Sequence, residues 1–219
     1  RKIVRTAGVT DADVALEIGP GLGSLTLALL EQAQSVIAVE IDKRLAEQLP
    51  KTVASHSENS ASLQVLNLDA LALSPLAQSP TVLVANLPYN VSVPVFLHVL
   101  EMMPTVQRGV VMVQAEVADR LAAKPHTKEY GIPSVKAAWW ADVSGAGSVS
   151  RTIFWPQPNV DSKLVAFTRH TPPGDEQLRR KVFTVIDLAF AQRRKMLRAA
   201  LSSLFGSSAD AERALHSVG

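Results

Sequence analysis

The sequence predicts an α/β fold, a largely parallel sheet flanked by helices, on three observations. A glycine-rich turn follows a short apolar strand and precedes a helix within residues 13–30. Apolar runs of strand length then alternate with helical segments along the chain. Polar residues follow the ends of these runs, most clearly in Asn86-Leu87-Pro88-Tyr89-Asn90 after the run 81–85. Because ligands of open α/β sheets bind at the carboxyl ends of the strands, these ends predict the site.

The first expected strand, residues 13–17, leads into the glycine turn and a helix over residues 24–30. The turn carries Gly19, Gly21 and Gly23, with Glu17 two residues before the first glycine. A dinucleotide site has the spacing G-x-G-x-x-G, whereas G-x-G-x-G after an acid is more typical of an S-adenosylmethionine site, whose ligand has no pyrophosphate. We therefore predict that these four residues bind S-adenosylmethionine; a purely structural glycine turn is the alternative.

Acidic residues close the next two expected strands. Glu40 lies at the end of the strand 35–41, 17 positions after Gly23, where an acid can accept both ribose hydroxyls of a nucleoside. Ile41, which follows it, and Asn86 are also expected to contact the cofactor, and Asp42 is expected to cap the next helix. Asp69 closes the strand 63–68 and, with Ala70, is predicted to meet the cofactor adenine. Asp69 could equally cap the segment that follows it.

The remaining segments complete a seven-stranded pattern. We expect strands at 81–85, 108–114 and 163–169, a sixth strand region at 135–142 and 149–153 with a turn at 145–147, helices at 91–103 and 116–123, and a polar loop at 124–134. Residues 171–174 form a Pro- and Gly-containing linker. Beyond it, apolar residues recur at helical spacing from Phe183 to Leu204.

Composition indicates an ordinary globular protein, with 47% hydrophobic and 19% charged residues. The chain has no cysteine, which excludes disulfides and Cys-ligated zinc, and we expect no metal site and a cytoplasmic location. The most apolar window, 82–100, is broken by two Asn and two Pro, so we expect no membrane span. Net charge is +2, but the segment from Thr171 onward carries +3, which favours a polyanionic partner or a solvated helix face.

Six motifs, in order along the chain, carry a resemblance to a known family. They are Glu17 to Thr26, Val39 to Asp42, Asn86 to Asn90, Gln114 to Leu121, Phe154 to Ser162 and Phe190 to Leu197. With them the chain resembles the ribosomal RNA adenine dimethyltransferases, and most closely their bacterial small-subunit branch. The resemblance implies the class I S-adenosylmethionine-dependent methyltransferase fold, a Rossmann-like seven-stranded sheet. It implies a catalytic domain over residues 1–170 and a small helical, RNA-contacting domain over 171–219.

The activity implied by the resemblance is methyl transfer to N6 of two adjacent adenosines near the 3′ end of 16S rRNA, within a 30S particle and by a monomer. Methylation of 23S rRNA that confers antibiotic resistance, and a non-catalytic nucleic-acid-binding relative, are the alternatives. The intact Glu40, Asp69 and Asn-Leu-Pro-Tyr turn favour an enzyme, and the basic C-terminal segment favours the small subunit.

The turn after residue 85 suits the chemistry of an exocyclic amine. The Asn86 side-chain oxygen can accept one N–H, the Leu87 carbonyl can accept the other, and Pro88 stiffens the turn. Tyr89 can stack on the base, for about 1–3 kcal/mol, and the resemblance places Phe154 on its other side. Since the methylated nitrogen becomes acidic, no general base is expected. A turn role for Asn86 and a packing role for Tyr89 are the alternatives.

Basic side chains near the site and on the C-terminal segment are the candidates for RNA binding. They are Arg120, Lys124, Lys128, Arg193, Arg194, Lys195 and Arg198. A solvated helix face is the alternative for each. The chain departs from the family at His126, usually Gly, and at Pro133, usually Leu. It begins at Arg1 without the family's N-terminal Gln-Asn-Phe-Leu segment, and we expect both ends to be trimmed.

Overall fold

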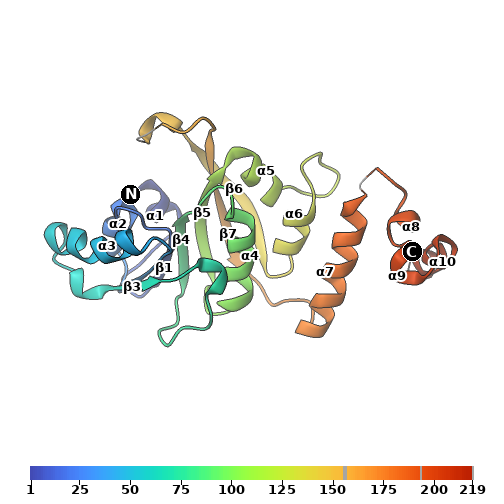
Figure 1. Ribbon diagram of the computed structural model, residues 1–219, viewed down its shortest axis with the longest axis horizontal. Helices are drawn as coiled ribbons and strands as arrows, with labels where there is room; N and C mark the ends of the chain where they lie inside the picture. The colour runs from blue at the N-terminus through green and yellow to red at the C-terminus, as the bar shows by residue number, and fades with distance from the viewer. Residues whose placement is uncertain (155–156, 193, 219) are drawn as a thin grey trace.

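In the computed structural model, which describes residues 1–154, 157–192 and 194–218, one sheet with helices on both faces forms the body of the molecule (Figure 1). Within these residues, seven strands are arranged in the order β3-β2-β1-β4-β5-β7-β6. The strands are β1 (Val14–Ile18), β2 (Ser35–Glu40), β3 (Leu63–Asn67), β4 (Val82–Asn86), β5 (Arg108–Gln114), β6 (Ala141–Val149) and β7 (Ser162–Arg169). β1 to β5 pair in parallel, while β7 is antiparallel to both β5 and β6.

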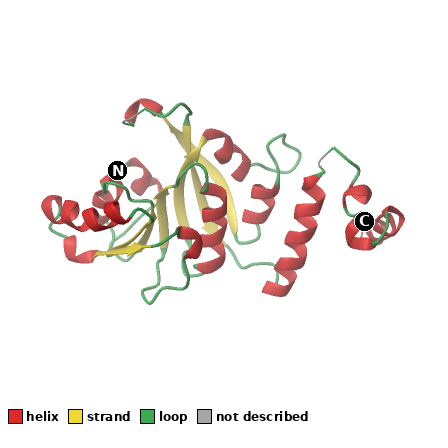
Figure 2. Ribbon diagram, viewed as in Figure 1, coloured by secondary structure: helices red, strands yellow, loops and turns green. Residues whose placement is uncertain are grey.

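Helices follow most strands, as an alternating α/β chain requires (Figure 2). The α-helices are α1 (Lys2–Thr6), α2 (Ser24–Leu30), α3 (Lys43–His56), α4 (Ser92–Met102), α5 (Ala115–Leu121), α6 (Ile132–Ala137), α7 (Glu176–Ala191), α8 (Leu197–Ala200), α9 (Ser202–Phe205) and α10 (Ser208–Val218). Short 3₁₀ turns are η1 (Ser60–Ser62), η2 (Ala70–Ala72) and η3 (Arg151–Ile153). None of the helices in the described part of the chain is long and apolar enough to cross a membrane.

Alternation along each strand divides the hydrophobic residues between two cores. In β4, Leu83 and Ala85 belong to a first core, and Val82 and Val84 to a second. The first core is covered by α4, α5 and α6, and the second by α1, α2 and α3. A sheet covered on both faces explains why its strands read as almost continuous apolar runs. The predicted α/β fold with a seven-stranded sheet is confirmed.

The region predicted as the sixth strand is partly wrong. Residues 135–137 belong to α6, and β6 begins only at Ala141. Pro133 is the second residue of α6, where its missing N–H costs no helical hydrogen bond, and the Ser134 hydroxyl accepts a hydrogen bond from the Gly131 N–H. The apolar run resembles a strand because Ala137, Trp139 and Trp140 are buried in the first core.

The expected turn at residues 145–147 is also wrong, because β6 continues through it. The register between β6 and β7 shifts between Gly145 and Gly147, which marks a β-bulge. Gly147 has φ +110°, a conformation that side chains rarely adopt. The residues predicted as the second half of this strand, 149–153, contain only the last residue of β6 and the turn η3. The turn η3, which follows β6, projects beyond the sheet (Figure 1).

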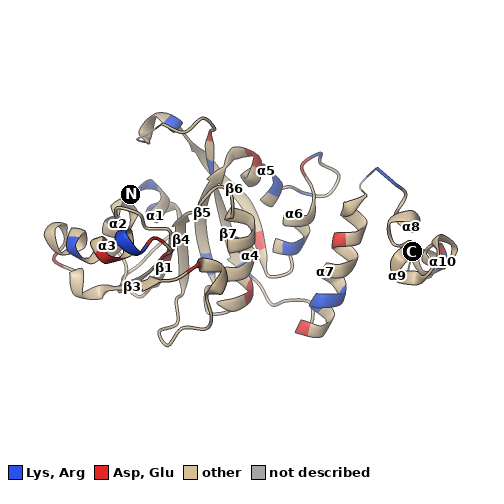
Figure 3. Cartoon of the chain, viewed as in Figure 1, with Lys and Arg blue, Asp and Glu red and all other residues tan. Residues whose placement is uncertain are grey.

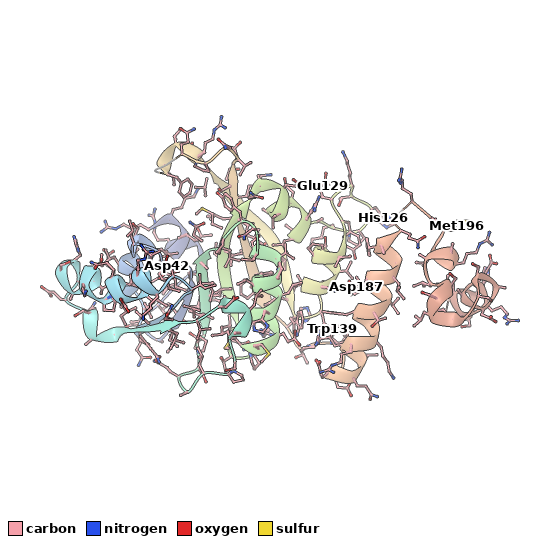
Figure 4. The ribbon with its side chains drawn as sticks, in the orientation of Figure 1. Asp42, His126, Glu129, Trp139, Asp187 and Met196 are labelled. Atoms are coloured by element: carbon pink, nitrogen blue, oxygen red, sulfur yellow. The ribbon has the colours of Figure 1, made fainter. Side chains whose placement is uncertain are left out.

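The C-terminal helices extend from the side of the sheet opposite α2 and α3 (Figure 1). α7 packs against α6, where the Lys136 ammonium lies 2.7 Å from the Asp187 carboxylate (Figure 4). The Phe183 ring packs edge-on against Trp139 and Trp140, with the Arg179 guanidinium 4.8 Å from its centroid. The predicted helical spacing from Phe183 to Leu204 therefore spans three helices, α7, α8 and α9.

Candidate active site

The three glycines after β1 adopt conformations that side chains disfavour. Gly19, Gly21 and Gly23 have φ of +68°, +56° and +91°. A Cβ on Gly23 would also lie 2.7 Å from the Leu49 side chain, so α2 and α3 could not keep their present approach. These positions explain the glycine pattern without any ligand. The N–H groups of the three glycines donate to the Val39 carbonyl, the Glu40 carboxylate and the Pro20 carbonyl respectively.

Glu40 ties the end of β2 to the glycine loop. Its Oε2 accepts a hydrogen bond of 3.1 Å from the Gly21 N–H, and its Oε1 accepts one of 3.0 Å from the Asp42 N–H. A carboxylate has about four acceptor positions, so two remain. That number matches a vicinal pair of hydroxyls, as in a ribose. The donor set at this position therefore fits a nucleoside cofactor.

Glu17 lies beneath the loop instead of on its surface. Its side chain is closed off from solvent, and its Oε2 accepts a 2.6 Å hydrogen bond from the Thr26 hydroxyl. Burial raises the pKa of Glu17 to about 8, and the nearby charge of Glu40 acts in the same direction, while the Thr26 hydroxyl opposes them. At neutral pH Glu17 is thus mostly protonated and supports the loop from below.

The ends of β2 and β3 form the neighbouring part of this edge. The Asp69 Oδ1 accepts a hydrogen bond from the Leu71 N–H at 2.9 Å, so Asp69 caps η2, and its Oδ2 remains for another donor. The capping role was one of its two predicted roles. Ala70 is the first residue of η2. The Asn67 amide donates to the carbonyls of Glu40 and Ile41, which joins the ends of the two strands.

Apolar side chains stand exposed around these polar groups. Leu22 in the glycine loop is 72% exposed, Ile41 68% and Leu71 41%. They follow β1, β2 and β3, whose carboxyl ends are adjacent in the sheet. Exposed apolar groups beside convergent polar ones are the usual lining of a small-molecule site. A flat adenine fits such walls better than water does.

The Asn-Leu-Pro-Tyr turn follows β4, the strand next to β1. Asn86 is the last residue of β4, and its side chain is exposed. Leu87 is buried, and its N–H donates to the Met112 carbonyl at 3.0 Å, while the Pro88 carbonyl accepts from the Val91 N–H at 3.2 Å. The turn is thus fixed at both ends, with the Asn86 amide facing outward.

This turn lies against the glycine loop. A Cβ on Gly19 would be 3.7 Å from the Asn86 carbonyl oxygen and 3.8 Å from the Pro88 ring. A single added carbon would thus be in ordinary contact with the turn, so the two loops lie next to each other. The structure therefore brings the predicted cofactor residues and the predicted base-binding residues together at one edge of the sheet.

Tyr89 and Phe154 are held separately. The Tyr89 hydroxyl and the Ser162 hydroxyl share a 2.7 Å hydrogen bond. Phe154 lies between η3 and β7, is half-buried, and packs against the second core. Within the described chain, no aromatic contact joins Phe154 to Tyr89. Trp155 and Pro156, which belong to the same motif, lie outside the described residues.

The basic candidates divide into those in ion pairs and those that are exposed and form no ion pair within the described residues. Figure 3 colours the Lys and Arg positions of the described chain blue. Arg120 pairs with Glu116 at 2.6 Å along α5, and Arg198 pairs with Glu212 at 2.5 Å, joining α8 to α10. The exposed candidates are Lys124 and Lys128, in the loop between α5 and α6, and Arg194 and Lys195, between α7 and α8. Arg193 lies outside the described residues. The C-terminal candidates are far from the glycine loop (Figure 1).

His126 occupies the same loop as Lys124 and Lys128 (Figure 4). Its φ is +72°, the single positive value among the described non-glycine residues. Such a conformation costs a side-chain-bearing residue roughly 1–2 kcal/mol. The resemblance puts Gly at this position, and the backbone conformation gives the physical reason for that preference.

Three supporting residues have no role in the sequence prediction: Thr26, Asn67 and Ser162. Each supports a predicted residue through a hydrogen bond, with Glu17, with the Glu40 carbonyl and with Tyr89 respectively. Thr26 and Ser162 stand inside the quoted motifs, and Asn67 stands at a strand end two residues before Asp69. The sequence does show that each of these residues is polar and lies at an expected buried or strand-end position. It does not show which residue each one bonds to, because the hydrogen-bond partner is not a neighbour in the sequence.

Comparison of the sequence with known families and proteins gives consistent matches. The model of a family described as ribosomal RNA adenine dimethylase matches residues 1–217. A ribosomal RNA small subunit methyltransferase A from Thermobifida fusca is 59% identical over 221 residues, which covers 100% of this chain and 77% of that protein. The protein of that name from Leifsonia xyli is 58% identical, with 100% and 79% covered.

Solved structures with a similar fold include two transferases with more than a quarter of their aligned residues identical to this chain. A dimethyladenosine transferase from Plasmodium falciparum has a TM-score of 0.77 and 28% identity, and the match covers 92% of this chain and 71% of that one. The 23S rRNA methyltransferase ErmE has a TM-score of 0.70 and 27% identity, with 91% and 79% covered.

Proposed function

The chain belongs to the ribosomal RNA adenine dimethylase family, and from that premise we propose that it transfers methyl groups from S-adenosylmethionine to N6 of two adjacent adenosines near the 3′ end of 16S rRNA. The observation that carries this proposal is the proximity of the glycine loop and the Asn-Leu-Pro-Tyr turn. A Cβ added to Gly19 would lie 3.7 Å from the Asn86 carbonyl oxygen. A methyl donor held by one loop would therefore lie beside a base held by the other.

Each of the cofactor-binding residues binds a different part of S-adenosylmethionine. Glu40 accepts the two ribose hydroxyls with its remaining acceptor positions, and Asp69 accepts from the adenine amine with Oδ2. Ile41 and its exposed apolar neighbours cover the adenine faces. The glycine loop, supported by Glu17 from below, holds the remainder of the ligand. When bound, S-adenosylmethionine supplies an electrophilic methyl group on its sulfonium.

The target amine is aligned by acceptors and needs no base. Its lone pair is delocalised into the adenine ring, so the amine must be held with that pair directed at the methyl carbon. The Asn86 Oδ1 and the Leu87 carbonyl accept its two N–H groups, and Pro88 keeps that carbonyl in place. As the N–C bond forms, the nitrogen becomes cationic and acidic, and its proton passes to water. Most of the acceleration then comes from proximity and alignment.

The RNA must present the base outside its stack. We propose that the adenosine swings out of the RNA into the pocket, where Tyr89 and Phe154 cover its faces. Exposed cations then bind phosphates, chiefly Lys124, Lys128, Arg194 and Lys195, because Arg120 and Arg198 are already paired with acids. Residues 1–170 form the catalytic part and 171–219 the helical part, and the protein acts as a monomer on the 30S particle in the cytoplasm.

Methylation of 23S rRNA is the second candidate, and the similarity to ErmE supports it. The small subunit is favoured because relatives with 58–59% identity carry that name, whereas ErmE is 27% identical. A non-catalytic role is disfavoured by the complete set of polar groups at the carboxyl edge. A protein that had lost its chemistry would have no need to keep Asn86 exposed on a fixed turn.

One assay separates these candidates. The protein and radiolabelled S-adenosylmethionine are incubated with 30S particles that lack the modification, with 50S particles, and with free 16S rRNA. We expect label in the 30S particle, recovered as N6,N6-dimethyladenosine after digestion. Label in 50S particles alone would favour the second candidate, and label in neither subunit would contradict both enzymatic proposals.

A further inference from the structure

The hydrogen bond between Tyr89 and Ser162 joins two segments that lie 73 positions apart in the sequence. Ser162 is fully buried, whereas Tyr89 is half-buried and follows Asn86 by three positions on the same turn. The bond is 2.7 Å long, the usual length between two hydroxyls. The polar end of the tyrosine is therefore attached to the interior of the protein, not to solvent.

Ser162 is a rigid point of attachment. It is the first residue of β7 and pairs with Gln114 of β5 on one side and with Val149 of β6 on the other. The adjacent Asp161 carbonyl also accepts a hydrogen bond of 2.9 Å from the Ala115 N–H. A strand start held on both sides moves little, so its hydroxyl keeps a constant position relative to the sheet.

The bond restricts the tyrosine ring in two ways. With Cβ fixed on the turn and the hydroxyl fixed at Ser162, the ring cannot swing about χ1. The phenolic oxygen is conjugated with the ring, so its proton and its better acceptor direction lie near the ring plane, and a strong bond also limits rotation of that plane. The orientation of the stacking face is thus determined before any base arrives.

We propose that Ser162 is a positioning residue, which fixes the Tyr89 ring so that an incoming adenine stacks with its amine already directed at the methyl donor. The inference rests on the proposed function and adds to it a residue that acts through Tyr89. Phe154 precedes β7, the strand whose first residue anchors Tyr89.

A purely structural role makes a different prediction. If Tyr89 served only to satisfy a buried serine hydroxyl, loss of the bond would lower stability and leave turnover unchanged. If Ser162 positions the ring, turnover falls while the protein still folds and still binds its cofactor. The two roles are separated by kcat, measured beside stability and cofactor affinity.

The first test is a double-mutant cycle with Ser162→Ala and Tyr89→Phe, assayed on 30S particles that lack the modification. Each change removes the same hydrogen bond, so we expect each to lower kcat about three- to tenfold, and the double variant to be no slower than either one. The KM for particles should stay within about twofold, since it depends on RNA contacts spread over a wider surface. The Kd for S-adenosylmethionine, measured by calorimetry, should also stay within about twofold, because the glycine loop determines it. Ser144→Ala, at an exposed position of β6, is the matched control.

The second test does not depend on turnover. The chain has two tyrosines, Tyr89 and Tyr130, so Tyr130→Phe leaves Tyr89 as the single signal in a protein labelled with ring-¹³C tyrosine. In that background, Ser162→Ala should shift the resonance and narrow it as the ring becomes mobile, whereas Ser144→Ala should do neither.

The outcomes are distinct. Multiplicative effects in the cycle, an unchanged kcat in Ser162→Ala, or an unchanged Tyr89 resonance would overturn the positioning role while the parent protein remains active. An inactive parent protein would instead contradict the proposed function, and the positioning role for that reaction with it.

Discussion

The hydroxyl of Thr26 donates a 2.6 Å hydrogen bond to the carboxyl group of Glu17, and neither side chain reaches solvent. Burial keeps the pKa of Glu17 near 8, so the acid that precedes the glycine loop holds its proton at neutral pH. An ionised carboxylate in this place would have one hydroxyl for a partner and the charge of Glu40 nearby. The acid of the motif therefore acts in this structure as a neutral support of the loop.

Glu17 makes the stability of the protein depend on pH in a predictable direction. In the unfolded chain the group ionises near its ordinary value of about 4.5, whereas in the folded chain it ionises near pH 8. Between these values the folded state binds more protons, so stability falls as pH rises and levels off above about 8. Glu17→Gln removes this dependence and should be more stable than the parent at pH 8, by about 1–3 kcal/mol.

Urea unfolding at pH 5 and pH 8.5 measures the effect of Glu17→Gln. The parent should lose stability between the two values and the variant should lose less. Glu58→Gln, at an exposed position, serves as the control and should follow the parent. If Glu17→Gln and the parent changed in parallel across this range, the buried acid would be ionised in the folded protein.

Gly109 is required by packing. It lies in β5, and a Cβ there would collide with the Leu83 carbonyl oxygen and would come within 2.7 Å of the Phe167 ring. Neither backbone nor a buried ring can yield cheaply, so Gly109→Ala should cost about 3 kcal/mol or more. Gly145→Ala is the matched control, since a Cβ at that exposed position meets nothing within 4 Å. Thermal unfolding of the two variants, side by side, checks the difference.

The sequence predicts the parts of this molecule that local patterns determine. The helix Ser24–Leu30 and the strand Arg108–Gln114 have the predicted bounds. The glycine-rich turn marks the start of the helix, and a continuous apolar run marks the strand. α6 could not be predicted from the apolar run at 135–140, since it is buried between α4, α5 and α7 as well as against β6, and these neighbours come together only on folding. The need for glycine at position 109 could not be predicted either, because it arises from the Phe167 ring on another strand.

At the site, the sequence predicts which residues stand at the strand ends but not what holds them. Asn86 and Glu40 lie where their strands end, as the pattern requires. Ser162 and Thr26 support the site through partners that only folding brings near. Arg198 shows a limit of the charge pattern: it is predicted to bind RNA, and the pattern does not reveal its ion pair with Glu212, 14 residues later. RNA binding by Arg198 stays a prediction.

The exposed and paired arginines should respond differently to substitution. Arg194→Ala with Lys195→Ala removes two exposed charges, so RNA affinity should fall and the slope of log K against log salt should become shallower by about 1 for each phosphate that is no longer neutralised. Arg198→Ala instead leaves Glu212 without its partner, so it should loosen the packing of α8 on α10 with little change in that slope.

RNA titrations at several salt concentrations measure the slope, and hydrogen exchange of α10 measures the packing, so together they distinguish the two effects. Equal slopes for all variants would contradict a phosphate-binding role for Arg194 and Lys195.

Asn86 is the residue on which the proposed chemistry depends most. Asn86→Ala removes one of the two acceptors that direct the amine, while its exposed side chain contributes little to packing. By comparison with the loss of a single oriented polar group in other active sites, kcat should fall about 10²- to 10³-fold. The midpoint of thermal unfolding should stay within about 2 °C, and cofactor affinity should change less than tenfold.

Asn90→Ala, which changes an exposed amide at the end of the same turn, is the control and should keep kcat within about twofold. Single-turnover methylation of 30S particles gives the rate directly, and full activity in Asn86→Ala would mean that the Leu87 carbonyl alone aligns the amine.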